Sequence, residues 1–171
     1  MESLITKLRN YELVNNVIVV AIIYHLGMYC LKLEPLKNLS LIGELSIVYF
    51  VGLVVSRIGS LVLEPVCKTF KIVVYAPPEQ YYAAEKKDKK ISDIVEANNM
   101  YRSLSAGFFM ILFAKFVLNN WPTIMEALNP ENVILWILAI GFILAFRKQT
   151  GYVRRRVEAA LKADESSNEH K

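Results

Sequence analysis

Three ionisable side chains interrupt apolar stretches of this sequence: His25, Glu44 and Lys115. A charge at the centre of a membrane helix costs about 3 kcal/mol, so such residues normally face the interior of a helix bundle and pair with one another. An acid, an imidazole and an amine brought together could relay protons, line a path for an ion or small solute, or sense a condition at the outer face. The alternative is a structural ion pair, with the Lys115 ammonium group extended toward nearby lipid headgroups.

The positions of these residues along their expected helices place them at a similar depth. At about 1.5 Å per residue, counted from the ends of the apolar segments, all three lie in the outer half of a membrane. We therefore expect a contact between Glu44 and Lys115, with His25 nearby. The sequence leaves open whether this intramembrane polar cluster is a pathway or a clasp.

A second polar set is expected at the opposite, cytoplasmic mouth of the bundle. Arg57 lies inside an apolar segment, and Asn98, Asn99 and Arg102 lie just before another. Residues three or four apart share one face of a helix, so these side chains could form a polar layer with Arg57. Anchoring of Tyr101 and Arg102 at the membrane interface explains the same residues equally well.

The sequence contains no arrangement typical of catalysis or of metal binding. The two cysteines and two histidines are scattered, without the spacing of a metal site. We find no His-Glu-x-x-His sequence, no glycine-rich phosphate loop and no assembled set of serine, histidine and aspartate. We therefore expect no enzyme, no cofactor and no metal.

Four apolar segments must position these residues: 13–33, 39–63, 104–118 and 133–146. The chain is 54% hydrophobic, and a helix needs about 20 apolar residues to cross a bilayer. The last two segments reach this length only with flanking residues, but the polar remainder is too small to bury them as core helices. We predict an all-α, polytopic membrane protein, a bundle of four transmembrane helices with helical cytoplasmic extensions.

Basic residues set the expected orientation. Residues 64–102 contain seven lysines and arginines, 147–171 contain seven, and 119–132 contain none. Because cytoplasmic segments carry the excess of basic residues, we expect both termini and the central connection in the cytoplasm. The expected parts are residues 1–63 with the first transmembrane hairpin, a cytoplasmic loop with helical segments at 64–102, the second hairpin at 103–147, and a basic helix with a disordered tail at 148–171.

Proline, glycine and polar residues set the expected local boundaries of the cytoplasmic parts. A short helix is expected from Pro78 to about Lys87, and one uninterrupted helix from about Ile91 into the membrane. The fourth membrane helix is expected to continue outwards, with Gly151 as a kink, before the polar residues 163–171 become disordered.

Small residues recur at helical spacing. Gly52, Ser56 and Ser60 repeat every four residues, and Gly107 and Gly141 each have a small neighbour four residues away. Such stripes let helix backbones approach closely in lipid, within one chain or between chains. We expect helix contacts at these positions, and we expect a homo-oligomer because four-helix proteins of this size often assemble.

Three consecutive arginines follow the fourth apolar segment: Arg154, Arg155 and Arg156. Near a membrane, each basic residue gains about 1 kcal/mol from anionic headgroups, and a cytoplasmic partner is the alternative. Direct nucleic-acid binding is disfavoured, because only Tyr152 supplies an aromatic ring close by.

In layout alone, four helices with helical cytosolic extensions, the chain resembles small bacterial inner-membrane proteins, including the membrane subunits of phage-defence systems. The resemblance implies a bacterial inner-membrane location and identifies no site residue. We expect a membrane anchor, sensor or adaptor for a soluble cytoplasmic partner. The alternatives are a homo-oligomeric pore and a lipid-modifying or solute-transport protein.

Overall fold

The computed structural model describes the backbone of residues 13–34, 39–119 and 128–169, and within these ranges the chain contains helices and no strand. The all-helical prediction is therefore confirmed for the described chain. The helices are α2 (Leu13–Cys30), α3 (Leu41–Ile58), the π-helical turn η2 (Gly59–Leu63), α4 (Glu64–Thr69), α5 (Pro78–Lys87), α6 (Lys90–Asn119) and α8 (Pro130–Glu169).

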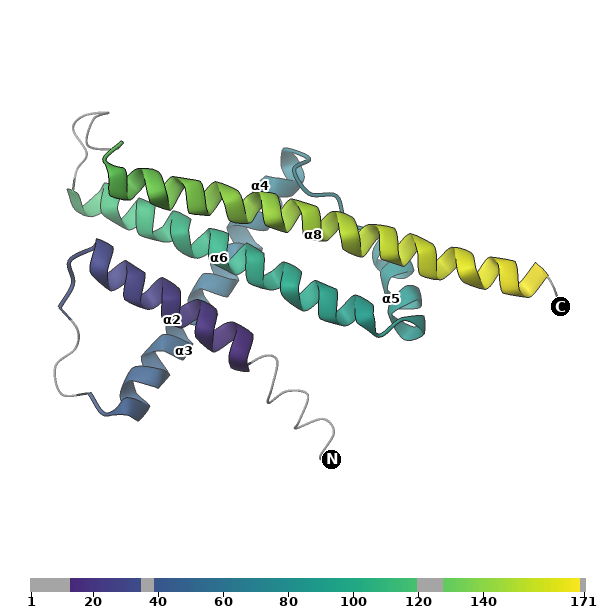
Figure 1. Cartoon of the computed structure of the whole chain (residues 1–171), viewed down its shortest axis with the longest axis horizontal. Coiled ribbons are helices and arrows are strands. Elements are labelled where there is room, and N and C mark those ends of the chain that lie inside the picture. Colours follow the sequence, from purple (N-terminus) through teal and green to yellow (C-terminus); the bar gives the residue numbers. More distant parts are fainter. Residues whose placement is uncertain (1–12, 35–38, 120–127, 170–171) are drawn as a thin grey trace.

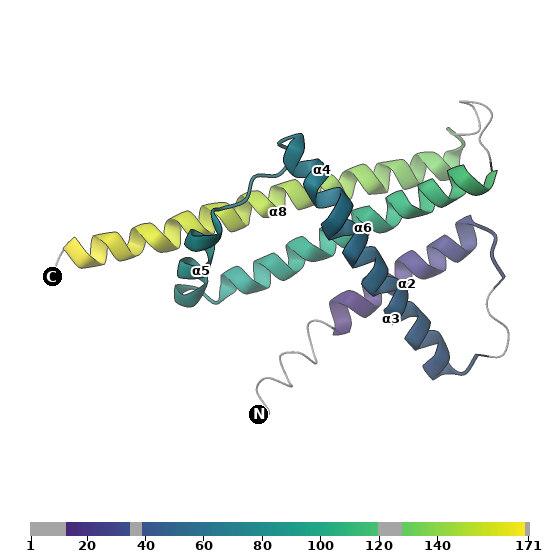
Figure 2. The same cartoon turned by 180° about the vertical axis from the view of Figure 1, so that it is seen from behind.

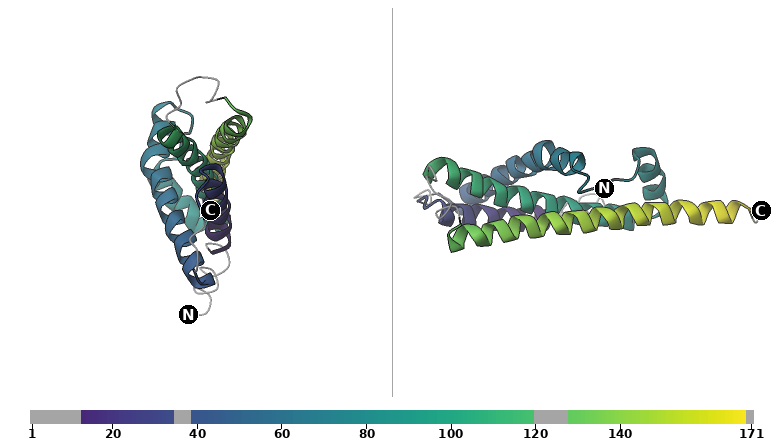
Figure 3. Two further views of the ribbon diagram at one scale, coloured as in Figure 1. Left: turned by 90° about the vertical axis from the view of Figure 1, so that its left-hand side faces the viewer. Right: turned by 90° about the horizontal axis from the view of Figure 1, so that it is seen from above.

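Two long antiparallel helices, α6 and α8, form the axis of the molecule (Figure 1). Helix α2 lies beside α6 and runs in the same direction, while α3 crosses both obliquely (Figure 2). Helix α5 packs against α8 and α6 at one end, and the last turns of α8 project beyond every other helix (Figure 3). We call this end the α5 end, and the end where α2 and α6 finish the far end.

Three helical segments are long and apolar enough to cross a membrane: Leu41–Thr69, Lys90–Leu118 and Pro130–Ala163. Large apolar side chains on these segments point outward, such as Phe50, Leu61, Phe113 and Ile137. Lipid would cover them, which supports a membrane protein. Helix α2 has 18 residues, and its part with described side chains, Val19–Cys30, is a shorter apolar helix.

The local boundaries of the second half follow from its prolines and its capping residues. Helix α5 begins at Pro78 and ends at Lys87, as predicted. Helix α8 begins at Pro130, where a missing N–H costs nothing, and the Asn129 side chain accepts a hydrogen bond from the Asn132 N–H at 2.8 Å. Helix α8 continues without interruption through Gly151 to Glu169 and so includes most of the tail that we expected to be disordered.

The π-helical turn η2 changes which face of the second apolar segment packs inward. Because Pro65 has no N–H and its ring clashes with the carbonyl of the residue four before it, a wider turn relieves the helix just before it. The Glu64 N–H bonds to the Gly59 carbonyl, five residues back. Beyond this turn Cys67 is buried and Val66 is exposed, one residue later than continuous α-helical spacing from Gly59 would give.

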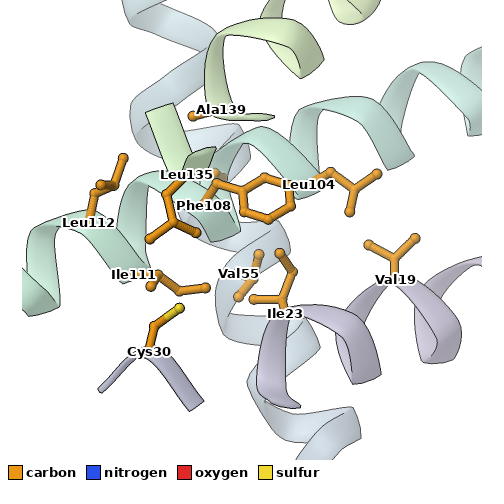
Figure 4. Packing of buried hydrophobic residues seen from close by; sticks show 11 residues of the cluster. Val19, Ile23, Cys30, Val55, Leu104, Phe108, Ile111, Leu112, Leu135 and Ala139 are labelled. Carbon is orange, nitrogen blue, oxygen red and sulfur yellow. The ribbon is translucent and has the colours of Figure 1, made fainter. Parts of the chain in front are cut away.

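The main apolar core lies where α2, α3, α6 and α8 meet (Figure 4). Its almost fully buried members include Ile23, Val55, Phe108, Leu135 and Ala139. A second cluster joins α5, α6 and α8, and a third joins the chain after α4 to Phe146 on α8. The α5 end is therefore packed onto the membrane helices and does not hang from them as a loose loop.

Glycines allow the closest helix crossings. A Cβ atom on Gly52 of α3 would lie 2.4 Å from a methyl group of Val20, and one on Gly107 of α6 would lie 2.7 Å from Ile23. Gly141 is exposed, with no neighbouring side chain within 4 Å of a Cβ placed there. Gly52 and Gly107 thus both face α2, whereas Gly141 faces outward. Ser56 and Ser60 are half-buried on α3 and η2.

Candidate functional site

Lys115 lies at the far end of the molecule, one turn before the end of α6, and its side chain is buried. Its Nζ atom is 2.5 Å from a carboxylate oxygen of Glu131, which lies in the first turn of α8 and is 44% exposed. An acidic residue is favourable at a helix N-terminus and a basic residue at a helix C-terminus. The pair therefore joins two helix ends that suit its two charges.

Glu44 and His25 lie apart from this ion pair. Both side chains are exposed, and Glu44 lies in the first turn of α3, at the end that points away from α6 and α8 (Figures 1 and 3). His25 has an edge contact with the ring of Tyr24. The expected Glu44–Lys115 contact is thus absent, and Glu131 takes the place of Glu44.

A cavity of about 440 Å³ opens beside the Lys115–Glu131 pair, between α2 and α8. Its lining is mostly apolar and includes Leu26, Cys30 and Leu138; Glu131 is the only charged residue among the described residues that line it. The cavity gives the carboxylate room, and the other polar groups of its described lining are the Tyr29 hydroxyl and the Cys30 thiol.

Polar contacts join α6 to α8 at intervals along their whole length. The Ser105 hydroxyl donates to the Ala139 carbonyl at 2.9 Å, and the Gln149 amide donates to the Ile94 carbonyl at 3.3 Å. Buried Asn98 and Thr150 lie between them, with their side-chain oxygens 3.1 Å apart. These contacts fix the register of two helices that otherwise meet through apolar side chains.

The second polar site centres on Glu64, the residue that directly follows the π-helical turn. One carboxylate oxygen accepts from the Lys68 ammonium group at 2.8 Å, and the other accepts from the Arg102 guanidinium group on α6. Gly59 lies against Ala106 and the Arg102 side chain, at distances where a Cβ atom would make ordinary van der Waals contact. Through its ion pair with Arg102, Glu64 therefore joins the continuous helical segment of α3, η2 and α4 to α6.

A cavity of about 330 Å³ lies beside Glu64, at the α5 end of the bundle. The chain between α4 and α5 forms one wall with Tyr75, and α5 adds Tyr81 and Tyr82. Helices α6 and α8 form the opposite wall. The cavity is therefore enclosed by four separate parts of the chain.

The structure brings together three of the four residues of the expected polar layer and leaves out the fourth, Arg57. Asn98, Asn99 and Arg102 line the cavity together, and Thr150 from α8 joins them. Arg57 is exposed on α3 and is not part of the lining. The Nε atom of Arg102 is buried and has no hydrogen-bond partner among the described residues.

Burial favours the protonated form of two tyrosines of this cavity, Tyr75 and Tyr81. Desolvation, with a smaller contribution from the nearby Glu64 carboxylate, raises the pKa of Tyr75 well above its usual range. Burial first and the Glu85 carboxylate second raise the pKa of Tyr81 to about 12. The Tyr81 hydroxyl donates to Glu85 at 3.1 Å. At neutral pH both phenols are therefore hydrogen-bond donors.

The three consecutive arginines of α8 point in different directions, because successive residues of a helix are about 100° apart. Arg156 turns inward, and its Nε atom lies 2.5 Å from a carboxylate oxygen of Asp88. Arg154 pairs with exposed Glu158 one turn away at 2.9 Å. The guanidinium group of Arg155 lies 4.8 Å from the centre of the Tyr152 ring. Arg156 thus holds the end of α5, while Arg154 and Arg155 remain on the outer surface.

Sequence reasoning missed most of the residues that complete these two sites. Glu131 was counted in the connection before α8, although Asn129 and Pro130 are typical of a helix start and place it in the first turn. The contacts of Glu64 and Lys68 depend on the extra residue that the π turn inserts before them. Pro65 is the only signal of this turn in the sequence. Among the described residues no group of three or more histidine, cysteine or acidic side chains could hold a metal ion.

Fold and sites together define an all-helical protein with three helices able to span a membrane, a buried ion pair at the far end and a polar cavity at the α5 end. Comparison of the chain with protein-family models, with curated proteins and with solved structures finds no match.

Proposed function

We propose that this chain is a membrane anchor and adaptor, which holds a soluble cytoplasmic partner at the α5 end. In this proposal α2 is a fourth membrane helix, the bundle lies in a bacterial inner membrane, and both termini and residues 64–102 face the cytoplasm. The excess of lysine and arginine at the α5 end supports this orientation.

The observation that carries the proposal is the length and continuity of α8. Its 40 residues extend over about 60 Å at 1.5 Å per residue, about twice the thickness of the apolar part of a bilayer. Val153 and Val157 pack against Ala84 and Ile91 outside the main core, so the outer half of α8 is braced by α5 and α6. A long continuous helix that leaves the membrane and carries exposed charges is suited to docking a protein.

The test is isolation of the full chain from its native membranes in mild detergent, with mass determination of the complex. We expect a soluble protein at a fixed ratio to this chain. The double variant Arg154→Glu/Arg155→Glu should reduce its recovery at least tenfold. The matched control is Lys71→Glu, which changes an exposed charge on the connection after α4 and should retain the partner.

A chain recovered alone, or a partner held equally by both variants, would contradict the adaptor proposal. Recovery of a homo-oligomer alone would instead favour the second candidate, a pore formed by several copies. The specific observation behind that candidate is the half-exposed Glu131 carboxylate beside buried Lys115. A pore of this kind requires ion flux through liposomes that changes when Lys115 is replaced by alanine.

A further inference from the structure

The cavity beside Glu64 has the size of a small-ligand site and a lining that selects by charge. Its volume of about 330 Å³ lies at the lower end of the range for ligand pockets, about 300–1,000 Å³. Three charged residues line it: Glu64, Lys68 and Arg102. Since both oxygens of the single carboxylate are engaged by the two cations, the cavity retains one net positive charge.

The remaining hydrogen-bonding capacity of the lining consists largely of donors. A guanidinium group has five N–H donors and an ammonium group has three, and Glu64 accepts from only some of them. The Nε–H of Arg102 has no acceptor among the described residues. Tyr82 adds a hydroxyl group to the same lining, whereas the Tyr75 hydroxyl is engaged by Glu64. A cationic ligand would meet Lys68 and Arg102, whereas an anion with several acceptor oxygens would find unused donors.

The position of the cavity relative to the membrane restricts the class of ligand further. Arg102 lies two residues before the apolar segment 104–118 of α6, so the cavity opens at the level where the membrane begins. Lys68, half-exposed at its rim, lies with its ammonium group 4.6 Å from the centre of the Tyr75 ring. A phosphate group combines negative charge with three or more acceptor oxygens and is abundant at this level.

We propose that the cavity between α4, α5, α6 and α8 binds a phosphate ester, either the headgroup of an anionic phospholipid or a soluble phosphate monoester. Lys68 and Arg102 hold the phosphate, and the Tyr82 hydroxyl and Asn99 bind the ester substituent. By joining α4 to α6 and α8, the ligand stabilises the α5 end. This proposal does not depend on a protein partner, because it concerns the chain alone.

The test uses the purified full chain in a neutral detergent and measures its thermal unfolding midpoint. Three probes are titrated: phosphatidylglycerol in mixed micelles, phosphatidylcholine in mixed micelles, and soluble glycerol 3-phosphate. We expect a saturable rise of the midpoint with phosphatidylglycerol or with glycerol 3-phosphate, and none with phosphatidylcholine. Saturation by the soluble ester identifies a soluble ligand, and saturation only by the lipid identifies a headgroup.

Two variants test the place of binding. Lys68→Gln should weaken the apparent affinity about tenfold, or about 1.4 kcal/mol, since it removes one of the two positive charges that hold the phosphate. Lys148→Gln is the control, because this residue lies on the outer surface of α8, over Tyr152, and should leave the affinity unchanged. Tyr82→Phe removes one lining hydroxyl without changing charge and should weaken binding about threefold.

The proposal is overturned if neither phosphate probe gives saturable binding, or if sulfate raises the midpoint as effectively as the esters. Equal losses in Lys68→Gln and Lys148→Gln would show attraction to the whole basic surface of the α5 end. A co-purified protein lost in Lys68→Gln, without any response to the esters, would assign the cavity to a protein partner instead.

Discussion

Lys115 and Glu131 form an ion pair in which the two side chains differ in environment: the lysine is 4% exposed and the glutamate is 44% exposed. Removal of either partner should therefore have unequal effects. Glu131→Ala leaves a buried ammonium group without its counter-ion and should cost about 3 kcal/mol. Lys115→Met leaves a carboxylate that water can reach and should cost about 1 kcal/mol or less.

Unfolding of the full chain in mixed detergent micelles measures both free energies, and the double variant Lys115→Met/Glu131→Ala should recover most of the loss. Glu44→Ala is the control, because its exposed side chain makes no ion pair among the described residues. Equal losses in the two single variants, or a loss in Glu44→Ala, would contradict the geometry.

This pair also shows what the sequence could predict. The burial of Lys115 and its need for an acidic partner follow from its place in an apolar segment. The choice of Glu131 over Glu44 depends on two facts that hydropathy does not contain: α3 crosses the bundle obliquely, and α8 begins at Pro130. The first displaces Glu44, and the second brings Glu131 into a helix.

Gly52 should tolerate no larger residue, because a Cβ atom would lie 2.4 Å from the Val20 side chain. The stiff β-branched valine cannot move aside easily, so Gly52→Ala should destabilise the chain by about 1–3 kcal/mol. Gly141→Ala has open space around its Cβ and should leave stability unchanged or slightly raised, since alanine favours a helix. Thermal midpoints of the two variants, measured in the same detergent, give the comparison, and equal midpoints would show that α3 does not cross α2 at Gly52.

The sequence predicts the helices of the α5 end but does not predict its cavity. Pro78 predicts the start of α5, and the absence of proline over the following membrane segment predicts the long α6. The cavity depends on Tyr75 and Tyr81, which the chain after α4 brings back across α6, and on the π turn that directs Glu64 toward Arg102. The return of the chain across α6 depends on contacts between distant parts of the chain, which local propensity cannot supply, and Pro65 is the single local signal of the π turn.

Tyr81 should make the protein sensitive to alkaline pH. Burial and the Glu85 carboxylate raise its pKa to about 12, so the protonated phenol is favoured in the folded state. This contribution is complete below the ordinary tyrosine pKa of about 10 and is lost as the pH rises through about 12. The unfolding midpoint of the wild type should fall more steeply above pH 10 than that of Tyr81→Phe.

Glu85→Gln separates the two causes of this shift. It removes the nearby charge and leaves the burial, which is the larger cause, so an intermediate steepness is expected. Identical alkaline profiles for the wild type and Tyr81→Phe would show that this phenol is open to water.

Asp88 joins three helices at the α5 end, and its loss should release α5. It follows the last residue of α5, accepts a hydrogen bond from the Lys90 N–H at 3.1 Å where α6 begins, and pairs with Arg156 of α8. Asp88→Ala and Arg156→Ala should both raise the hydrogen exchange of the α5 amides. Arg154→Ala removes a neighbouring arginine that pairs only within α8 and should leave this exchange unchanged.

The same contact gives a pH dependence of defined sign. The hydrogen bond from Arg156 is the main cause that lowers the pKa of Asp88 below its ordinary value of 3.8. A lowered pKa contributes stability that is present above the ordinary value and is lost as the pH falls through the folded-state value. After correction for intrinsic rates, protection of the α5 amides should be constant between about pH 5 and pH 8 and should fall below about pH 4. Asp88→Ala should lack this acid step, and an acid step of unchanged size in that variant would assign it to another carboxylate.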